Sequence, residues 1–133
     1  MSTVITPSAL IIDDSPVVRT VLSALLRQQA VRTTAVADGE AGLQAARESR
    51  PDLICLDLML PNQSGLEVCK QLRAEPKTSA VPILMVSARP YPQDQAAAMA
   101  AGADAFLPKP LDPAAVTATV RTLLWRAHQE RTR

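Results

Sequence analysis

The sequence predicts an α/β domain in which five strands form a parallel sheet and helices cover both faces. Short, almost wholly apolar runs alternate five times with longer segments whose apolar residues recur at helical spacing. Such apolar runs fit strands buried on both faces, and the intervening helices make the crossovers that parallel strands need. The chain has 133 residues, 47% of them hydrophobic, which suffices for one domain with its own core.

The first strand is predicted at residues 9–12, an apolar run that ends at Asp13 and Asp14. Ser15 and Pro16 then supply a helix cap and a proline at the first helical position. The apolar residues of the first helix recur at helical spacing: Val17, Val18, Val21, Leu22, Leu25 and Leu26. Residues 31–37, which are rich in valine and threonine, predict the second strand.

Asp38 and Gly39 predict a turn and the cap of a second, weaker helix, which ends before Pro51. Its apolar positions are Ala41, Leu43, Ala45 and Ala46. Residues 53–57 form the third strand, apolar until Asp57, and residues 58–64 are expected to be a loop. A third helix follows at residues 65–74. Its candidate buried positions are Leu66, Val68, Cys69 and Leu72.

The remaining elements repeat the alternation. Residues 83–87 predict a fourth strand, residues 93–101 an alanine-rich helix ended by Gly102, and residues 105–107 a short fifth strand. A last long helix begins at Asp112 and Pro113. Its predicted buried stripe is Val116, Val120, Leu123, Leu124 and Ala127. No interior linker or fixed-period repeat marks a second domain.

Composition excludes several classes of protein. The net charge of +1 gives no global attraction to nucleic acid or anionic membrane, and the basic stretch 121–133 fits a solvated helix face. Two cysteines are too few for a disulfide scaffold or a four-ligand zinc site, and Cys55 is expected to be a buried free thiol. Residues 1–8 do not resemble a signal peptide, and no apolar stretch is long enough to span a bilayer.

Polar residues stand at or just after four of the predicted strands: Asp13 and Asp14, Asp57, Ser87, and Lys109. The carboxyl ends of parallel strands share one edge of the sheet, so these side chains should converge on one crevice. Each alone is compatible with a cap, a turn or a surface charge. Their joint occurrence favours a site.

The charges in this crevice predict its ligands. Three neighbouring carboxylates raise one another's pKa, which a bound cation relieves. Oxygen ligands suit a hard divalent ion, and Mg2+ commonly shares its shell with a phosphate. Lys109 adds a second positive charge. A phosphoryl group between metal and ammonium, with Ser87 donating to one oxygen, completes the balance.

At this point the sequence resembles the receiver domain of two-component, phosphorelay signalling. The resemblance covers residues 9–124. The matching segments are Ile12-Asp13-Asp14-Ser15, Leu56-Asp57-Leu58-Met59-Leu60-Pro61 with Gly65, Val86-Ser87-Ala88, Lys109-Pro110 and residues 101–107. It implies a flavodoxin-like, doubly wound (βα)5 fold with strand order 2-1-3-4-5. Residues 1–133 then form one receiver domain, with a core at about 9–125 and a charged helical tail or linker start at 126–133.

The resemblance also implies roles for individual residues. Asp57 would be the phosphoacceptor and a metal ligand. Asp14 would bind Mg2+ directly, Asp13 mainly through water, and Met59 through its backbone carbonyl. The switch and phosphate-binding residues would be Lys109, Ser87 and the aromatic Phe106, and Lys109-Pro110 resembles a bond that is cis in this family and aims the lysine inward.

The implied function is that of a cytoplasmic signalling phosphoacceptor rather than an enzyme. Its partners would be a sensor histidine kinase or phosphotransfer protein, and a downstream target or an output domain. Direct nucleic-acid or membrane binding is not expected. Dimerisation through the last two helices and the fifth strand is a habit of the family. The sequence departs from the family in having Phe106 where tyrosine is common, and two prolines, Pro90 and Pro92, after Ser87.

Three other classes of protein share part of this pattern. An aspartyl-phosphate hydrolase of the haloacid dehalogenase type wants a second acid two residues after the nucleophile, where this chain has Met59. A flavodoxin wants a hydroxyl- and glycine-rich phosphate loop after the first strand, not two acids. A receiver-like interaction module that is never phosphorylated typically lacks an acid or the lysine, and stays open as the second function.

Overall fold

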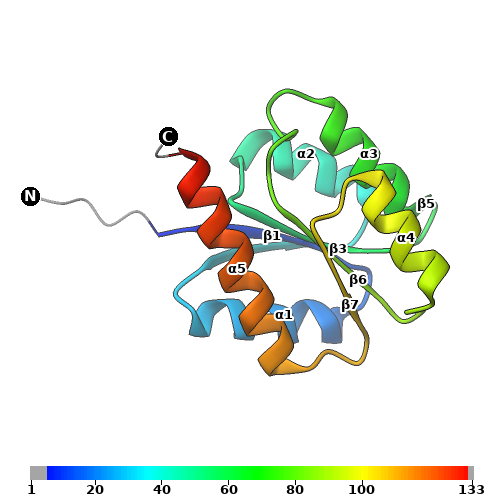
Figure 1. Cartoon of the computed structure of the whole chain (residues 1–133), viewed down its shortest axis with the longest axis horizontal. Coiled ribbons are helices and arrows are strands. Elements are labelled where there is room, and N and C mark those ends of the chain that lie inside the picture. The colour runs from blue at the N-terminus through cyan, green and yellow to red at the C-terminus, as the bar shows by residue number, and fades with distance from the viewer. Residues whose placement is uncertain (1–5, 132–133) are drawn as a thin grey trace, which may run out of the picture.

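The structure, a computed structural model, describes residues 6–131. Five strands form one parallel sheet in the order β2-β1-β3-β6-β7 (Figure 1). Numbered among themselves these strands stand in the order 2-1-3-4-5, so the predicted topology is confirmed. The strands are β1 (Ser8–Ile12), β2 (Arg32–Val36), β3 (Leu53–Asp57), β6 (Ile83–Ser87) and β7 (Ala105–Pro108).

Five helices cover the two faces of this sheet. Helices α1 and α5 lie on one face, and α2, α3 and α4 lie on the other (Figure 1). The helices are α1 (Pro16–Gln28), α2 (Gly39–Ser49), α3 (Gly65–Ala74), α4 (Pro92–Ala101) and α5 (Pro113–Arg131). Among these elements, none is a helix long and apolar enough to cross a membrane.

The apolar runs of the sequence are strands buried from both sides. All five residues of β3 and of β6 are buried. In β1, Ala9 and Ile11 face the α1–α5 side whereas Leu10 and Ile12 face the other side. Each large aliphatic side chain buried in this way contributes about 1.5–3 kcal/mol relative to full exposure.

The predicted N-caps of α1 and α2 are confirmed. The Ser15 hydroxyl accepts from the Val18 N–H at 3.3 Å, and an Asp38 carboxylate oxygen accepts from the Ala41 N–H at 2.8 Å. Because Ser15 directly follows the two acids after β1, the cap also fixes where α1 leaves the edge of the sheet.

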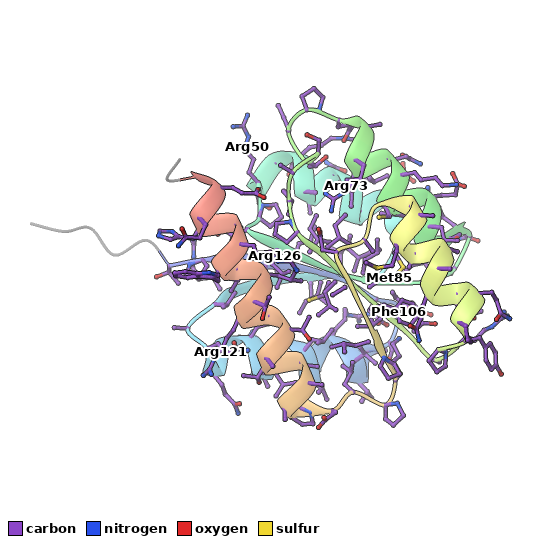
Figure 2. The ribbon with its side chains drawn as sticks, viewed as in Figure 1. Arg50, Arg73, Met85, Phe106, Arg121 and Arg126 are labelled. Carbon is purple, nitrogen blue, oxygen red and sulfur yellow. The ribbon has the colours of Figure 1, made fainter. Side chains whose placement is uncertain are left out.

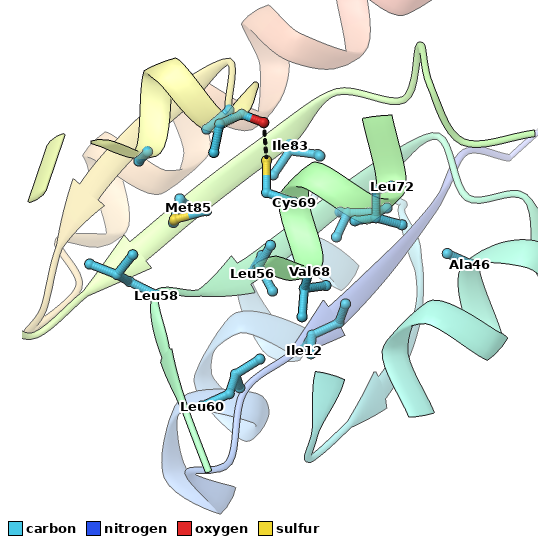
Figure 3. Packing of buried hydrophobic residues seen from close by; sticks show 14 of the residues in the cluster. Ile12, Ala46, Leu56, Leu58, Leu60, Val68, Cys69, Leu72, Ile83 and Met85 are labelled. Carbon is cyan, nitrogen blue, oxygen red and sulfur yellow. Dashed lines mark hydrogen bonds between the residues drawn. The ribbon is translucent and has the colours of Figure 1, made fainter. Parts of the chain in front are cut away.

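Figure 3 shows the core between the sheet and α3, where Val68, Cys69 and Leu72 pack with Ile83 and Met85. Both cysteines are free and buried, as predicted for Cys55. Burial raises the pKa of the Cys55 thiol to about 12. The Cys69 thiol lies 3.4 Å from the carbonyl oxygen of Ala101, to which it donates.

Some features differ from the sequence prediction. The expected loop 58–64 contains a two-stranded hairpin, β4 (Met59–Leu60) and β5 (Gln63–Ser64). On α1 the core side holds Val18, Leu22, Leu25 and Leu26, but Val17 and Val21 are exposed. The segment 126–133, predicted as a charged helical tail or the start of a linker, agrees with the first alternative and is helical through Arg131. Its last two residues, 132–133, and residues 1–5 of the segment judged not to be a signal peptide lie outside the described residues.

Arg73 joins three segments at the amino ends of β6 and β7. Its Nε donates to the Gly102 carbonyl at 2.9 Å, and its Nη1 donates to the carbonyls of Ser79 and Val81 at 3.1 and 2.6 Å. Its Nη2 lies 2.8 Å from Asp104. One guanidinium thereby ties the end of α3 to the loop before β6 and to the turn after α4 (Figure 2).

Candidate functional site

Three carboxylates meet at the carboxyl edge of the sheet, as predicted. Asp13 and Asp14 follow β1, and Asp57 is the last residue of β3. One carboxylate oxygen from each lies within 4.8 Å of the other two. Asp13 and Asp57 are buried, whereas Asp14 is exposed. The short segments after two neighbouring strands therefore bring three acids into one small space.

Lys109, which follows β7, reaches across the edge to two of these acids. Its ammonium lies 2.9 Å from Asp13 Oδ2 and 3.4 Å from Asp57 Oδ2, and its side chain is largely buried. Among the described residues, Lys109 is the cation in salt-bridge contact with these carboxylates, so the cluster keeps a net negative charge when all three acids are ionised. The predicted convergence of the acids and the lysine is present in the structure.

Backbone groups hold the two buried acids in place. The Ser15 N–H donates to Asp13 Oδ1 at 2.9 Å, and the Met59 N–H donates to Asp57 Oδ1 at 3.1 Å. Gly65 packs directly behind Asp57, because a Cβ at this position would collide with the Asp57 carbonyl oxygen. A residue without a side chain is needed there.

The surroundings of Asp57 disfavour its charged form. Burial raises the pKa of Asp57 to about 6, and the charge of Asp13 adds to the rise. The Met59 N–H and the Lys109 ammonium act in the opposite direction. A further cation beside Asp57 would therefore stabilise the ionised form of its carboxylate.

Ser87, the last residue of β6, lies between the acid and the lysine along the edge. The register places the preceding residue, Val86, opposite Asp57, and places Ser87 opposite Pro108, the residue before Lys109. The Ser87 side chain is fully buried. Its position matches the predicted one.

Three further predicted residues lie around this centre. Phe106 is partly buried in β7 and pairs with Met85 of β6 (Figure 2). The Lys109–Pro110 peptide bond is cis, as predicted. Met59 begins β4 with an exposed side chain, and its backbone adjoins the site through the bond to Asp57.

Sequence reasoning missed Arg19. Its Nη1 donates to the Asp13 carbonyl at 2.8 Å, which ties α1 to the acidic end of β1. An arginine in the second turn of a helix that starts beside paired acids is the signal that could have found it. Arg89, in the loop after β6, lies with its Nε 3.9 Å from Asp94 Oδ2 and stacks over Tyr91, with 5.8 Å from the guanidinium carbon to the ring centre.

Comparison with known proteins adds to this geometry. Residues 9–121 match the model of the response regulator receiver domain family. The chain belongs to this family. The receiver domain is 40% identical over 126 residues to the transcriptional regulatory protein AfsQ1 of Streptomyces coelicolor, a match that covers 95% of this chain and 55% of AfsQ1.

Solved structures agree with this assignment. The chemotaxis response regulator CheY4 of Vibrio cholerae superposes with a TM-score of 0.84 at 28% identity, covering 90% of this receiver domain and 99% of that chain. The receiver domain of the sensor histidine kinase PA1611 from Pseudomonas aeruginosa gives a TM-score of 0.83 at 30% identity, covering 90% and 98%. That structure holds a magnesium ion in its active-site cleft. The chain spans about half the length of the curated relatives it matches.

Proposed function

We propose that this receiver domain accepts a phosphoryl group on Asp57 with the help of Mg2+, and then changes conformation to control a partner or an output domain. The supporting observation is the set of three carboxylates within 4.8 Å of one another, two of them in contact with Lys109. The domain acts as a signalling phosphoacceptor and not as an enzyme with external turnover. The alternative, an interaction module that is not phosphorylated, predicts no covalent adduct.

The donor set fits Mg2+. Carboxylate oxygens are the ligands that this ion prefers, and the excess negative charge of the three acids favours a dication. Asp14 and Asp57 would hold it directly, Asp13 mainly through water, and Met59 through its carbonyl. When bound, the ion neutralises charge on the phosphoryl oxygens and on the attacking carboxylate.

The transfer step uses a carboxylate oxygen of Asp57 as the nucleophile. A bond forms between this oxygen and phosphorus while the phosphorus–nitrogen bond of the donor's phosphohistidine breaks. The leaving imidazole nitrogen keeps the electron pair and then takes a proton from water. Lys109 Nζ, already 3.4 Å from Asp57 Oδ2, is in reach of the new phosphoryl oxygens. Positioning and charge neutralisation carry most of this chemistry.

The conformational response depends on Ser87 and Lys109. A shift of a two-state population from 1:99 to 99:1 needs about 5.5 kcal/mol, and a hydrogen bond to a charged group supplies roughly 1.5–3 kcal/mol. One new contact is insufficient, whereas contacts from Ser87 and Lys109 together approach the requirement. Phe106 would change its rotamer as Ser87 moves.

The partners follow from the chemistry of transfer. The phosphoryl donor would be a sensor histidine kinase or a phosphotransfer protein. Val17 and Val21 on α1 are 72% and 39% exposed, and they follow the acids closely in the chain, so they offer apolar contacts to a donor seated over Asp57. Control of a downstream target, and dimerisation through α4, β7 and α5, remain predictions.

Labelling by acetyl phosphate tests the proposal. Wild type incubated with this donor and Mg2+ should gain the mass of one phosphoryl group. The gain should be absent without Mg2+ and absent in Asp57→Asn. An adduct that persists in Asp57→Asn would place the acceptor elsewhere. No adduct in the wild type would favour the interaction module, and sustained release of phosphate without a stoichiometric adduct would indicate a hydrolase.

A further inference from the structure

Two adjoining hollows lie between α1 and β2, and none of the three acids lines them. The first has a volume of about 290 Å³ and is lined by Pro16, Arg19, Thr20, Ser23, Arg27 and Ala35. The second has a volume of about 460 Å³ and is lined by Thr6, Arg27, Ala30, Val31, Arg32 and Thr33. Arg27 lines both hollows, which together make up the α1–β2 groove.

The floor of this groove is an unpaired strand edge. β2 is the outermost strand, and in the described part of the chain no strand pairs with its far side. The N–H of Arg32 and the carbonyl of Val36 bond toward β1, so every second residue of β2 faces its neighbour. The N–H and carbonyl groups of Thr33 and Ala35 therefore point to the open side. These two residues are also the strand residues, with Arg32, that line the groove.

The walls of the groove are basic. Arg19, Arg27 and Arg32 line it, no aspartate or glutamate does, and α1 contains no acidic residue. Arg19 and Arg27 are eight positions apart, which on a helix corresponds to about 12 Å. Two side chains four positions apart on one face of a strand are about 13 Å apart. Acidic side chains at that spacing on an added strand would meet both arginines.

We propose that the α1–β2 groove binds an extended, acidic segment of a partner protein, which pairs with the outer edge of β2 as a further strand. Backbone groups of Thr33 and Ala35 provide the ladder, and Arg19 and Arg27 select acidic residues at positions i and i+4. Strand addition of this kind takes affinity from main-chain hydrogen bonds and specificity from alternate side chains. The groove shares Arg19 with the edge of the phosphoacceptor site, because the Arg19 Nη1 also donates to the Asp13 carbonyl, but the proposed binding does not depend on phosphorylation.

A protein segment suits this groove better than a nucleic acid does. Outward N–H and carbonyl groups that alternate along β2 match an extended peptide backbone, which a phosphodiester chain cannot pair with. The chain's net charge of +1 also gives no broad attraction to a polyanion.

The test is an NMR titration of the full, 15N-labelled chain with a synthetic peptide. The peptide alternates threonine and valine and carries two glutamates four positions apart. Amide signals of Thr33 and Ala35 should shift, and binding should weaken as salt is raised. The same peptide with glutamines should bind more weakly, by about fivefold. A peptide N-methylated on the pairing edge should not bind.

Two variants separate the backbone from the charges. Ala35→Pro removes an outward N–H and leaves the ladder to β1 intact, so it should weaken binding about tenfold while labelling by acetyl phosphate stays at the wild-type level. Arg27→Gln should weaken binding two- to fivefold. The control is Arg121→Gln, an exposed arginine on α5 outside the groove, which should bind as wild type (Figure 2).

Three results would overturn the proposal. One is unchanged binding of the peptide by Ala35→Pro, or equal binding of the N-methylated peptide. Another is an equal loss in Arg27→Gln and Arg121→Gln, which would show only nonspecific charge attraction. The last is a shift of the Thr33 and Ala35 amide signals by a single-stranded DNA oligonucleotide at the concentrations at which the peptide shifts them. That result would assign the groove to nucleic acid.

Discussion

The Ser87 hydroxyl makes two hydrogen bonds with the backbone of Arg89. It accepts from the Arg89 N–H at 2.9 Å and donates to the Arg89 carbonyl oxygen at 3.3 Å. In this arrangement the side chain is bonded to its own loop. The hydroxyl has a single proton, so it must give up the bond to the Arg89 carbonyl before it can donate to a phosphoryl group on Asp57, although its oxygen can still accept from the Arg89 N–H. The loop between β6 and α4 therefore responds to what the site holds.

Ser87→Ala should separate phosphorylation from this response. Acetyl phosphate should label the variant to near wild-type stoichiometry, because Asp57 and its neighbours are unchanged. The amide signals of residues 88–91 should shift much less on phosphorylation than in the wild type, as two-dimensional NMR can measure. Ser87→Thr keeps a hydroxyl and should retain the shifts. A full wild-type shift pattern in Ser87→Ala would remove this hydroxyl from the coupling.

Lys109→Gln should destabilise the metal-free domain. The change removes an ammonium that contacts both Asp13 and Asp57, and the loss should be on the order of 2–3 kcal/mol because buried carboxylates lose their partner. Urea unfolding without Mg2+ measures it, and added Mg2+ should restore part of the loss. Lys70→Gln is the matched control. Lys70 is exposed and lies 3.9 Å from Glu67, so its removal should cost less than about 0.5 kcal/mol.

Asp57→Asn should stabilise the metal-free domain above about pH 6. The folded pKa of Asp57, about 6, lies above its ordinary value of 3.8, so the folded state binds this proton more tightly. As pH rises from 3.8 to about 6, ionisation of Asp57 therefore lowers the free energy of unfolding. At pH 7 the variant should exceed the wild type by on the order of 1–3 kcal/mol, and the gain should vanish below about pH 4. Unfolding curves at several pH values check the sign, and a less stable variant at pH 7 would contradict it.

Gly65→Ala should impair both stability and phosphorylation. The new methyl group meets the backbone of Asp57 and Leu58, which has little freedom to move, and the cost should be about 1–3 kcal/mol. Labelling by acetyl phosphate should slow because the Asp57 backbone shifts. Ser64→Ala serves as the comparison. It removes the helix cap that accepts from the Leu66 N–H at 3.1 Å, and should cost about 1 kcal/mol without slowing the labelling.

Strands, caps and the convergence of the polar residues could be predicted because each left a local signal. Uninterrupted apolar runs marked β3 and β6, and Ser15 and Asp38 marked helix starts. The polar residues at strand ends then had to share one edge. The hairpin of β4 and β5 left no such signal. Its strands have two residues each, and its turn contains Asn62 with a φ of 65°.

Other features depend on three-dimensional packing. Six apolar residues on α1 cover more than one stripe, so spacing alone did not show that Val17 and Val21 face outward. The contact of Arg19 with the Asp13 carbonyl and the direction of the Arg89 side chain depend on rotamers. The sequence likewise could not show that the Lys109 ammonium contacts both Asp13 and Asp57.

The network around Arg73 has a mechanical consequence for α4. The bond from Arg73 to the Gly102 carbonyl anchors the carboxyl end of α4. The amino end of α4 follows the loop that is hydrogen-bonded to Ser87. We expect α4 to pivot about its anchored carboxyl end when Asp57 carries a phosphoryl group. The displacement should be largest at Pro92 and small at Ala101.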